Sequence, residues 1–298
     1  MQLGNLLKNL FFLLLFLQIA PTFIKNIKDQ YSSFLSSRSK VAVLTIENNI
    51  TDASTYIKQL RQFFKREDIK ALLLKINSPG GFAGSSQAIF QEILTLKHTH
   101  NKPVITYVEN ICASGAYYVA CSADTLIATP SAMLGSIGVY IQHPQLHEFM
   151  EQWHIKYNVI SSGSYKTAGS PFLPATPEHR KMLQAVTNDT HQQFIKDVLA
   201  QRTKLSSKKV KEWGEGQVFT GNQALTYGLI DGTGSLQKVE QELKAKMGTQ
   251  EEIEWVKAPT ASFSWKKFFF QGPKFDTTTF LTHLLDSSSH GQAAPALQ

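Results

Sequence analysis

Residues 111–118, Ile111-Cys112-Ala113-Ser114-Gly115-Ala116-Tyr117-Tyr118, form the junction around which this chain is organised. A strand-like apolar run over 103–108 precedes them, and apolar residues at helical spacing follow them. Ser114 is therefore expected between a strand and a helix, where unpaired N–H groups and the positive end of the helix dipole are found. A serine at such a point is commonly an N-cap. It can instead be a nucleophile, because Gly115 would let a substrate carbonyl approach the backbone closely.

The composition is that of a globular protein with a sizeable core, as one large domain or two small ones. Of its 298 residues, 42% are hydrophobic and 18% are charged. The net charge of +7 is moderate, and the basic residues are scattered without interleaved aromatic residues. Nucleic acid is therefore not an expected partner. A weak attraction to anionic lipid is compatible with this charge.

Two cysteines, Cys112 and Cys121, flank Ser114. They lack the four-ligand spacing of a zinc site, and no metal or other cofactor is expected. We expect both to be small buried hydrophobic residues. A disulfide between them would have to span the predicted helix, and the sequence does not establish that geometry.

The N-terminus predicts a membrane segment. Residues 10–20 are apolar except for Gln18, and Lys8 precedes them. No good cleavage site follows, because Gln18 and Pro21 occupy unfavourable positions around it. We therefore expect an uncleaved signal-anchor over residues 1–24. A cleaved signal and a buried helix are the alternatives.

A polar, serine-rich linker is expected over residues 25–40. The basic residues around the anchor predict its orientation in the membrane. More basic residues follow it than precede it, which by the positive-inside rule favours a cytoplasmic domain. These residues are Lys25, Lys28, Arg38 and Lys40.

The rest of the chain alternates continuous apolar runs with helical patterns, which predicts an α/β fold with a mainly parallel sheet. Strands are expected over residues 41–46, 71–76, 103–108, 125–128, 137–140 and 157–160. Helices are expected over residues 51–65, 84–97, 144–153, 177–204, 208–213, 221–227 and 236–247. The domain is expected over residues 41–247, followed by a partly disordered C-terminal extension over 248–298.

Two further stretches carry chemistry. Ser78-Pro79-Gly80-Gly81 follows a buried strand and can supply half of an oxyanion hole, or be an ordinary turn. The small-residue stretch 161–171 contains one charged residue, Lys166. A desolvated lysine beside a hydroxyl has a lowered pKa and can act as a neutral base. The commoner state of a lysine is a solvated loop residue.

Together these stretches resemble the signal peptide peptidase A (protease IV) family of membrane-anchored Ser-Lys proteases. The resemblance runs from about Val41 to Leu236, with further matching motifs at 135–138, 218–221 and 228–231. Ala116 and Cys112 depart from the residues usual in the family, which have glycine and an apolar residue there.

The resemblance implies a role for each matching residue. Ser114 would be the nucleophile, Lys166 the general base, and Ser136 the hydroxyl that orients the lysine. The amides of Gly81 and Gly115 would form the oxyanion hole. This arrangement is chemically consistent, because serine needs a base and neutral lysine can supply one.

The resemblance also implies a Clp protease/crotonase-like fold, a repeated β-β-α spiral with a helical C-terminal part. It implies a homo-oligomeric ring in which Ser and Lys meet across a subunit boundary. Leu134, Ile137 and Tyr165 would line an apolar substrate pocket. The substrates would be hydrophobic peptides such as signal peptide remnants, and the domain would lie outside the cytoplasm at the inner (cytoplasmic) membrane of a bacterium.

Three other interpretations stay open at this point. A Ser-His-Asp triad is one, although Ser114 is not in a G-x-S-x-G elbow. A crotonase-type acyl-CoA enzyme would use the glycine amides but would not need Ser114 or Lys166. A non-catalytic membrane scaffold would need none of these residues.

Overall fold

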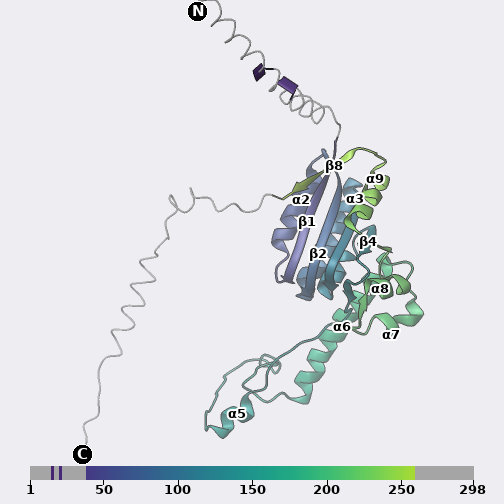
Figure 1. Cartoon of the computed structure of the whole chain (residues 1–298). Coiled ribbons are helices and arrows are strands. Elements are labelled where there is room, and N and C mark those ends of the chain that lie inside the picture. The colour runs from purple at the N-terminus through teal and green to yellow at the C-terminus, as the bar shows by residue number, and fades with distance from the viewer. Residues whose placement is uncertain (1–14, 17–19, 22–37, 259–298) are drawn as a thin grey trace, which may run out of the picture. The chain divides into compact units, whose positions relative to one another are not determined.

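The computed structural model describes residues 15–16, 20–21 and 38–258 (Figure 1). Most of the predicted anchor over 1–24, nearly all of the linker and the C-terminal extension from residue 259 lie outside these ranges. Among the residues that are described, no helix has the length and apolar character needed to cross a membrane.

One sheet organises the described domain. Its central strand order is β6-β5-β3-β2-β1-β8, with β4 pairing β3 and β7 pairing β4. Every pairing is parallel except that of β5 with β6. The predicted α/β class with a mainly parallel sheet is therefore confirmed. The strands are β1 (Arg38–Ile50), β2 (Ile69–Gly81), β3 (Val104–Ala113), β4 (Thr125–Ala128), β5 (Met133–Gly135), β6 (Val218–Thr220), β7 (Gly232–Thr233) and β8 (Glu252–Lys257).

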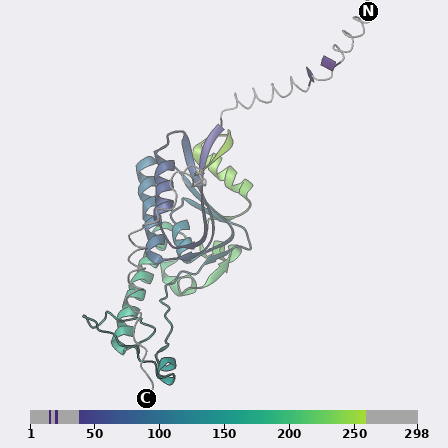
Figure 2. The ribbon, with the colours of Figure 1, turned by 90° about the vertical axis from the view of Figure 1, so that its left-hand side faces the viewer.

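Helices cover both faces of this sheet, which explains the continuous apolar runs of its strands. On β2, Leu72 and Leu74 pack in the same core cluster as helices α2 and α3, while Leu73 packs in the cluster of α9. Figure 2 shows the purple and blue helices on the opposite side of the sheet from the yellow-green one. The helices are α2 (Ser54–Lys65), α3 (Ala83–His100), α4 (Gly115–Ala120), α5 (His147–Gln152), α6 (Pro177–Gln201), α7 (Val210–Trp213), α8 (Gly221–Tyr227) and α9 (Leu236–Met247), with a 3₁₀ turn, η1, at Ser207–Lys209.

Two predicted strands are wrong. Residues 137–140 form no strand, because Gly135 and Ser136 take positive φ angles of 95° and 51° and end β5 before them. Residues 157–160 also form none, and Ile160 is fully exposed. Apolar β-branched residues favour strands, yet a strand also needs a neighbour to pair with.

Strand β8 is an element that the sequence did not predict. It pairs in parallel with β1, from Arg38 opposite Glu252 to Val43 opposite Lys257. The sheet therefore extends beyond residue 247. Ile253 and Trp255 of this strand pack against the core on the α9 side.

Helix α6 connects the middle of the chain to the core. Thr176 caps its N-terminus by accepting a hydrogen bond from the His179 amide at 3.2 Å. Its buried residues, Phe194 and Val198, lie in its C-terminal half. The first half is therefore outside the core, and it carries the segment with α5 (Figure 1).

Candidate active site

Ser114 lies between β3 and α4, where the sequence predicted it. Its backbone has φ 51° and ψ −126°, a conformation that costs a non-glycine residue about 1–3 kcal/mol. Its amide donates to the Gly135 carbonyl at 2.8 Å. Within the described part of the chain, its side chain makes no capping hydrogen bond to α4. The N-cap interpretation is therefore wrong, and the hydroxyl sits on a strained turn without that structural task.

Helix α4, which follows Ser114, is held by contacts from distant parts of the chain. All of its residues are buried. The Tyr117 hydroxyl donates to the Leu229 carbonyl at 2.6 Å. The buried Arg202 guanidinium donates to the Cys121 carbonyl at 3.0 Å and to Asp231 at 2.7 Å. Hydrogen bonds to residues far along the chain therefore hold the helix that follows Ser114 in place.

The two glycine stretches meet at Ser114. A Cβ on Gly80, whose φ is +109°, would lie 2.8 Å from the Gly115 nitrogen and 2.9 Å from the Ser114 Cβ. A Cβ on Gly115 would lie 3.3 Å from the Gly81 nitrogen. The structure therefore brings the two predicted oxyanion-hole residues together beside the predicted nucleophile. Only glycine allows such a close approach of backbones.

The glycine turn is itself fixed by hydrogen bonds. The Ser78 hydroxyl donates to the Asn48 carbonyl at 2.5 Å and accepts from the Gly80 amide at 3.1 Å. A Cβ on Gly81 would lie 2.1 Å from the Ile50 carbonyl oxygen, so β1 also touches this turn. These contacts hold the turn against the end of β1.

Ser136 follows β5, the strand that pairs with the end of β3 before Ser114. Ala113 pairs with Gly135 across β3 and β5, so each serine follows one member of that pair. Both serines have a φ of 51°. Neighbouring strands lie about 4.8 Å apart, which places the two residues side by side.

Lys166 is in a different environment. It ends a turn in which its amide donates to the Gly163 carbonyl at 3.1 Å, and it is exposed. No side-chain hydrogen bond or ion pair links it to another described residue. The desolvation expected of a neutral lysine is therefore absent in the single chain.

Two histidines of α6 show how far the Lys166 turn is from Ser136. Near the start of the helix, His179 Nε2 donates to the Ser164 carbonyl at 2.8 Å. Further along, His191 Nε2 lies 3.2 Å from the carbonyl oxygen of Ile137, the residue after Ser136. The two histidines are about 18 Å apart along the helix axis, at 1.5 Å per residue. The structure does not bring Lys166 to Ser114 within one chain.

The residues predicted to line a substrate pocket also differ in burial. Leu134 and Ile137 have no exposed surface, while the Tyr165 side chain is 53% exposed. The two aliphatic residues belong to the main core cluster of the single chain. Their role stays a prediction.

Exposed apolar side chains gather in residues 140–172. Those more than half exposed are Tyr140, Phe149, Trp153, Ile155, Ile160 and Tyr165. A concentration of this kind on one segment is typical of a surface that meets a partner.

The two cysteines are unsuited to nucleophilic chemistry. Cys112 and Cys121 are free and buried, which confirms the expectation of small buried residues. Burial raises the pKa of both thiols, that of Cys121 to about 11. Among the described residues, no cluster of three or more His, Cys, Asp or Glu side chains could hold a metal ion.

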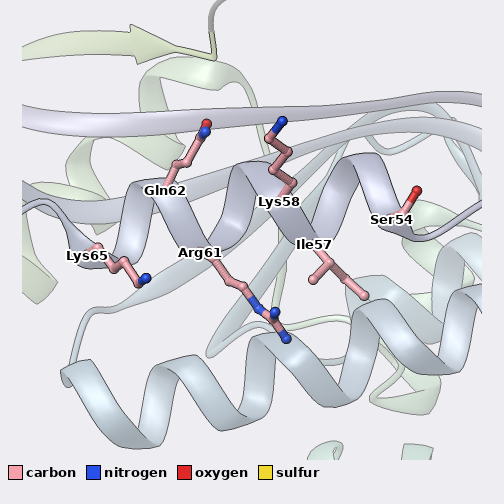
Figure 3. Close-up of a pocket in the computed structure, with 6 residues that line it drawn as sticks. All are labelled: Ser54, Ile57, Lys58, Arg61, Gln62 and Lys65. Carbon is pink, nitrogen blue, oxygen red and sulfur yellow. The ribbon is translucent and has the colours of Figure 1, made fainter.

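A pocket on α2 is a poor candidate for chemistry. Its described lining residues all come from that helix, and Arg61 points from it toward α3 while Lys58 points away (Figure 3). Arg61 pairs with Glu92 at 2.7 Å. Ser54, the one hydroxyl of this lining, donates to Asp52 at 2.5 Å. The hydrogen bonds from Ser54 hold the pKa of the Asp52 carboxyl below its usual range, which makes this carboxylate a weak base.

The chain was compared with known families and proteins. The profile of peptidase family S49 matches residues 97–250, and the Clp protease profile matches residues 25–135. A putative protease of Methanocaldococcus jannaschii is 36% identical over 194 residues, covering 64% of this chain and 61% of that protein. A putative protease of Synechocystis is 34% identical over 208 residues, covering 69% and 74%. A putative signal peptide peptidase SppA of Enterococcus faecium is 28% identical over 222 residues, covering 70% and 64%.

Proposed function

This chain belongs to peptidase family S49, and on that premise we propose that it is a membrane-anchored serine endopeptidase that cleaves hydrophobic peptides with a Ser-Lys dyad. Membership confirms the family and the class, a serine peptidase, that the sequence predicted. One observation carries the proposal further. Ser114 has a strained backbone and an uncapped side chain, and it lies beside the amides of Gly81 and Gly115.

The proposed reaction begins at Ser114. Its Oγ attacks the carbonyl carbon of the scissile peptide bond, and neutral Lys166 takes the hydroxyl proton. The carbonyl oxygen gains negative charge and is held by the amides of Gly81 and Gly115, each worth about 3 kcal/mol. Lys166 then returns the proton to the leaving amine. In the second half of the reaction, neutral Lys166 takes a proton from water, and the water oxygen attacks the acyl carbon. Lys166 then returns the proton to the Ser114 oxygen as the product acid leaves.

The lysine would come from a neighbouring subunit. The support is geometric: the Lys166 turn is tied to the start of α6, about 18 Å along the helix from the contact beside Ser136. The exposed apolar residues of segment 140–172 would form the contact between subunits. Assembly of a homo-oligomeric ring would bury Lys166 beside Ser136, and the desolvation would lower the pKa of the lysine.

The remaining features of the proposal rest on the sequence. Residues 1–24 would anchor the protein in the inner membrane of a bacterium, with the domain outside the cytoplasm, although the basic residues after the segment favour the opposite orientation. The domain would follow the β-β-α spiral, in line with the Clp protease match. Tyr165, with Leu134 and Ile137 behind the surface, would select apolar substrate side chains.

The test is peptidase activity of the full-length, detergent-solubilised protein on a quenched hydrophobic peptide. We expect Ser114→Ala and Lys166→Ala each to lose activity by roughly 10⁴-fold or more while the melting temperature stays near that of the wild type. A fluorophosphonate should label the wild type at Ser114. Activity retained in Lys166→Ala would mean that another group is the base.

An acyl-CoA enzyme of the crotonase type is less well supported. Such an enzyme would use the glycine amides alone, and its serine would have no reason to adopt a strained, uncapped conformation. Binding of CoA by the purified protein, together with no labelling by fluorophosphonate, would favour that alternative.

A further inference from the structure

Ser86 carries a buried hydroxyl that the proposed reaction does not use. The residue lies in α3 and has no exposed surface. Its Oγ has no hydrogen-bond partner among the described residues. A buried hydroxyl without a partner is unfavourable, and in a native protein it calls for an explanation.

Two hydroxyls further along α3 show the usual alternative. Thr95 and Thr99 donate to the carbonyls four residues earlier, at 3.0 and 2.9 Å. The equivalent carbonyl for Ser86, that of Phe82, accepts the Ser86 amide at 3.0 Å, but the Ser86 hydroxyl does not bond to it. The side chain is directed elsewhere.

The hydroxyl packs against the oxyanion-hole residues instead. A Cβ on Gly115 would lie 2.2 Å from Ser86 Oγ and 3.3 Å from the Gly81 nitrogen. The missing side chain of Gly115 therefore makes the space that the Ser86 hydroxyl fills. This places a rotatable O–H dipole against Gly115 and close to the Gly81 nitrogen.

We propose that Ser86 is a positioning residue of the oxyanion hole. Its unpartnered hydroxyl turns its dipole toward the negative charge that develops on the substrate carbonyl oxygen, and it supports the Gly115 amide from behind. No existing hydrogen bond has to break for this rotation. A dipole at a buried position such as that of Ser86 acts more strongly than it would in solvent. The inference rests on the proposed peptidase function.

The test compares two fully buried serines, Ser86 and Ser122. Ser122 is the matched control, because its hydroxyl is satisfied by the Val119 carbonyl at 2.6 Å and lies outside the site. We would measure kcat and KM of full-length Ser86→Ala and Ser122→Ala on a hydrophobic peptide. The same preparations would give the affinity for a peptide aldehyde, which forms a tetrahedral adduct, and for the product peptide.

For Ser86→Ala we expect kcat to fall roughly tenfold, short of the roughly 100-fold to 1,000-fold cost of losing a direct oxyanion-hole donor. The affinity for the aldehyde should weaken by a similar factor. KM and the affinity for the product peptide should not change, and the melting temperature should not fall. Ser122→Ala should keep its kcat and lose about 2–4 °C in melting temperature.

An unchanged kcat in Ser86→Ala, with wild type and Ser122→Ala both active, would overturn the inference and leave the peptidase proposal intact. A loss of kcat that comes with weaker product binding and a lower melting temperature would also overturn it, because it would show a structural role. If wild type and Ser122→Ala are both inert, the peptidase proposal itself fails and the inference falls with it.

Discussion

The surroundings of Ser114 and of Lys166 differ in their burial and in the parts of the chain that hold them. Ser114 follows a central strand and precedes a fully buried helix, whereas Lys166 is exposed in a turn held to the first part of α6. The helix after Ser114 makes hydrogen bonds with distant parts of the same chain, at Leu229 and Arg202. The segment that holds Lys166 shows apolar side chains to solvent. In the proposed enzyme, one chain would therefore build the nucleophile half of the site by itself, and the base half would come from another copy.

Outside the proposed dyad, the largest effect on activity should come from a substitution in the exposed segment 140–172. Ile160→Asp places a charge on a fully exposed apolar residue and should weaken the proposed subunit contact. We expect activity to fall about 100-fold at low protein concentration, because the lysine is then misplaced. Sedimentation should show smaller particles. Leu225→Asp, a partly exposed position on α8, is the control and should change neither property.

Two glycines with positive φ, one beside Ser114 and one near Lys166, should differ in how much their substitution lowers the free energy of unfolding. Gly80→Ala meets backbone atoms at 2.8 Å, whereas Gly169→Ala meets nothing within 4 Å. We expect Gly80→Ala to lower the free energy of unfolding by about 3 kcal/mol and Gly169→Ala by about 1 kcal/mol. Urea unfolding of the full-length protein measures both. Equal losses would mean that the glycine turn beside Ser114 is not tightly packed.

A smaller effect should follow from the support of α4. Tyr117→Phe removes the hydroxyl that donates to the buried Leu229 carbonyl and should cost about 1–3 kcal/mol. Tyr140→Phe changes a hydroxyl on a side chain that is 81% exposed and should cost nothing measurable. A Tyr117→Phe protein as stable as the wild type would show that α4 does not depend on this contact.

The last prediction concerns the thiols that flank Ser114 in the sequence and leaves the substrate reaction untouched. Burial raises the pKa of Cys121 from 9.0 to about 11, so the neutral thiol is favoured in the folded protein. Its contribution to stability is complete below pH 9 and is lost as the pH rises toward 11. At pH 8, iodoacetamide should label the folded protein about 100-fold more slowly than the unfolded chain. Rapid labelling would show that the core around α4 opens readily.

The sequence predicted the parts of the site that depend on local signals. Ser114 was placed correctly at a strand-to-helix junction, because an apolar run and small residues mark that point. The contact between Ser86 and Gly115 could not be predicted, since it joins two helices through the space left by a missing side chain. Strand β8 was missed because it too depends on a distant element: its residues form a strand by pairing with β1.

The errors also have a physical cause. Residues 137–140 and 157–160 have strand-like composition, and composition carries no information about available partners. The positive φ angles at Gly135 and Ser136 end β5 early. Residues 157–160 remain exposed instead of entering the sheet. Helix α8, in contrast, has the bounds that the sequence predicted, and a local capping box between Thr220 and Gln223 fixes its start.

The most direct measurement mixes two inactive proteins. Ser114→Ala keeps Lys166, and Lys166→Ala keeps Ser114, so a ring containing both would have some sites with an intact serine and an intact lysine from different subunits. The two variants would be purified separately, dissociated, mixed and reassembled in detergent, and assayed on the hydrophobic peptide. A dyad shared between subunits predicts that activity returns on mixing, to roughly a quarter of the wild-type level for random assembly of equal amounts. Activity that stays at background after mixing, with mixed particles demonstrated, would contradict it.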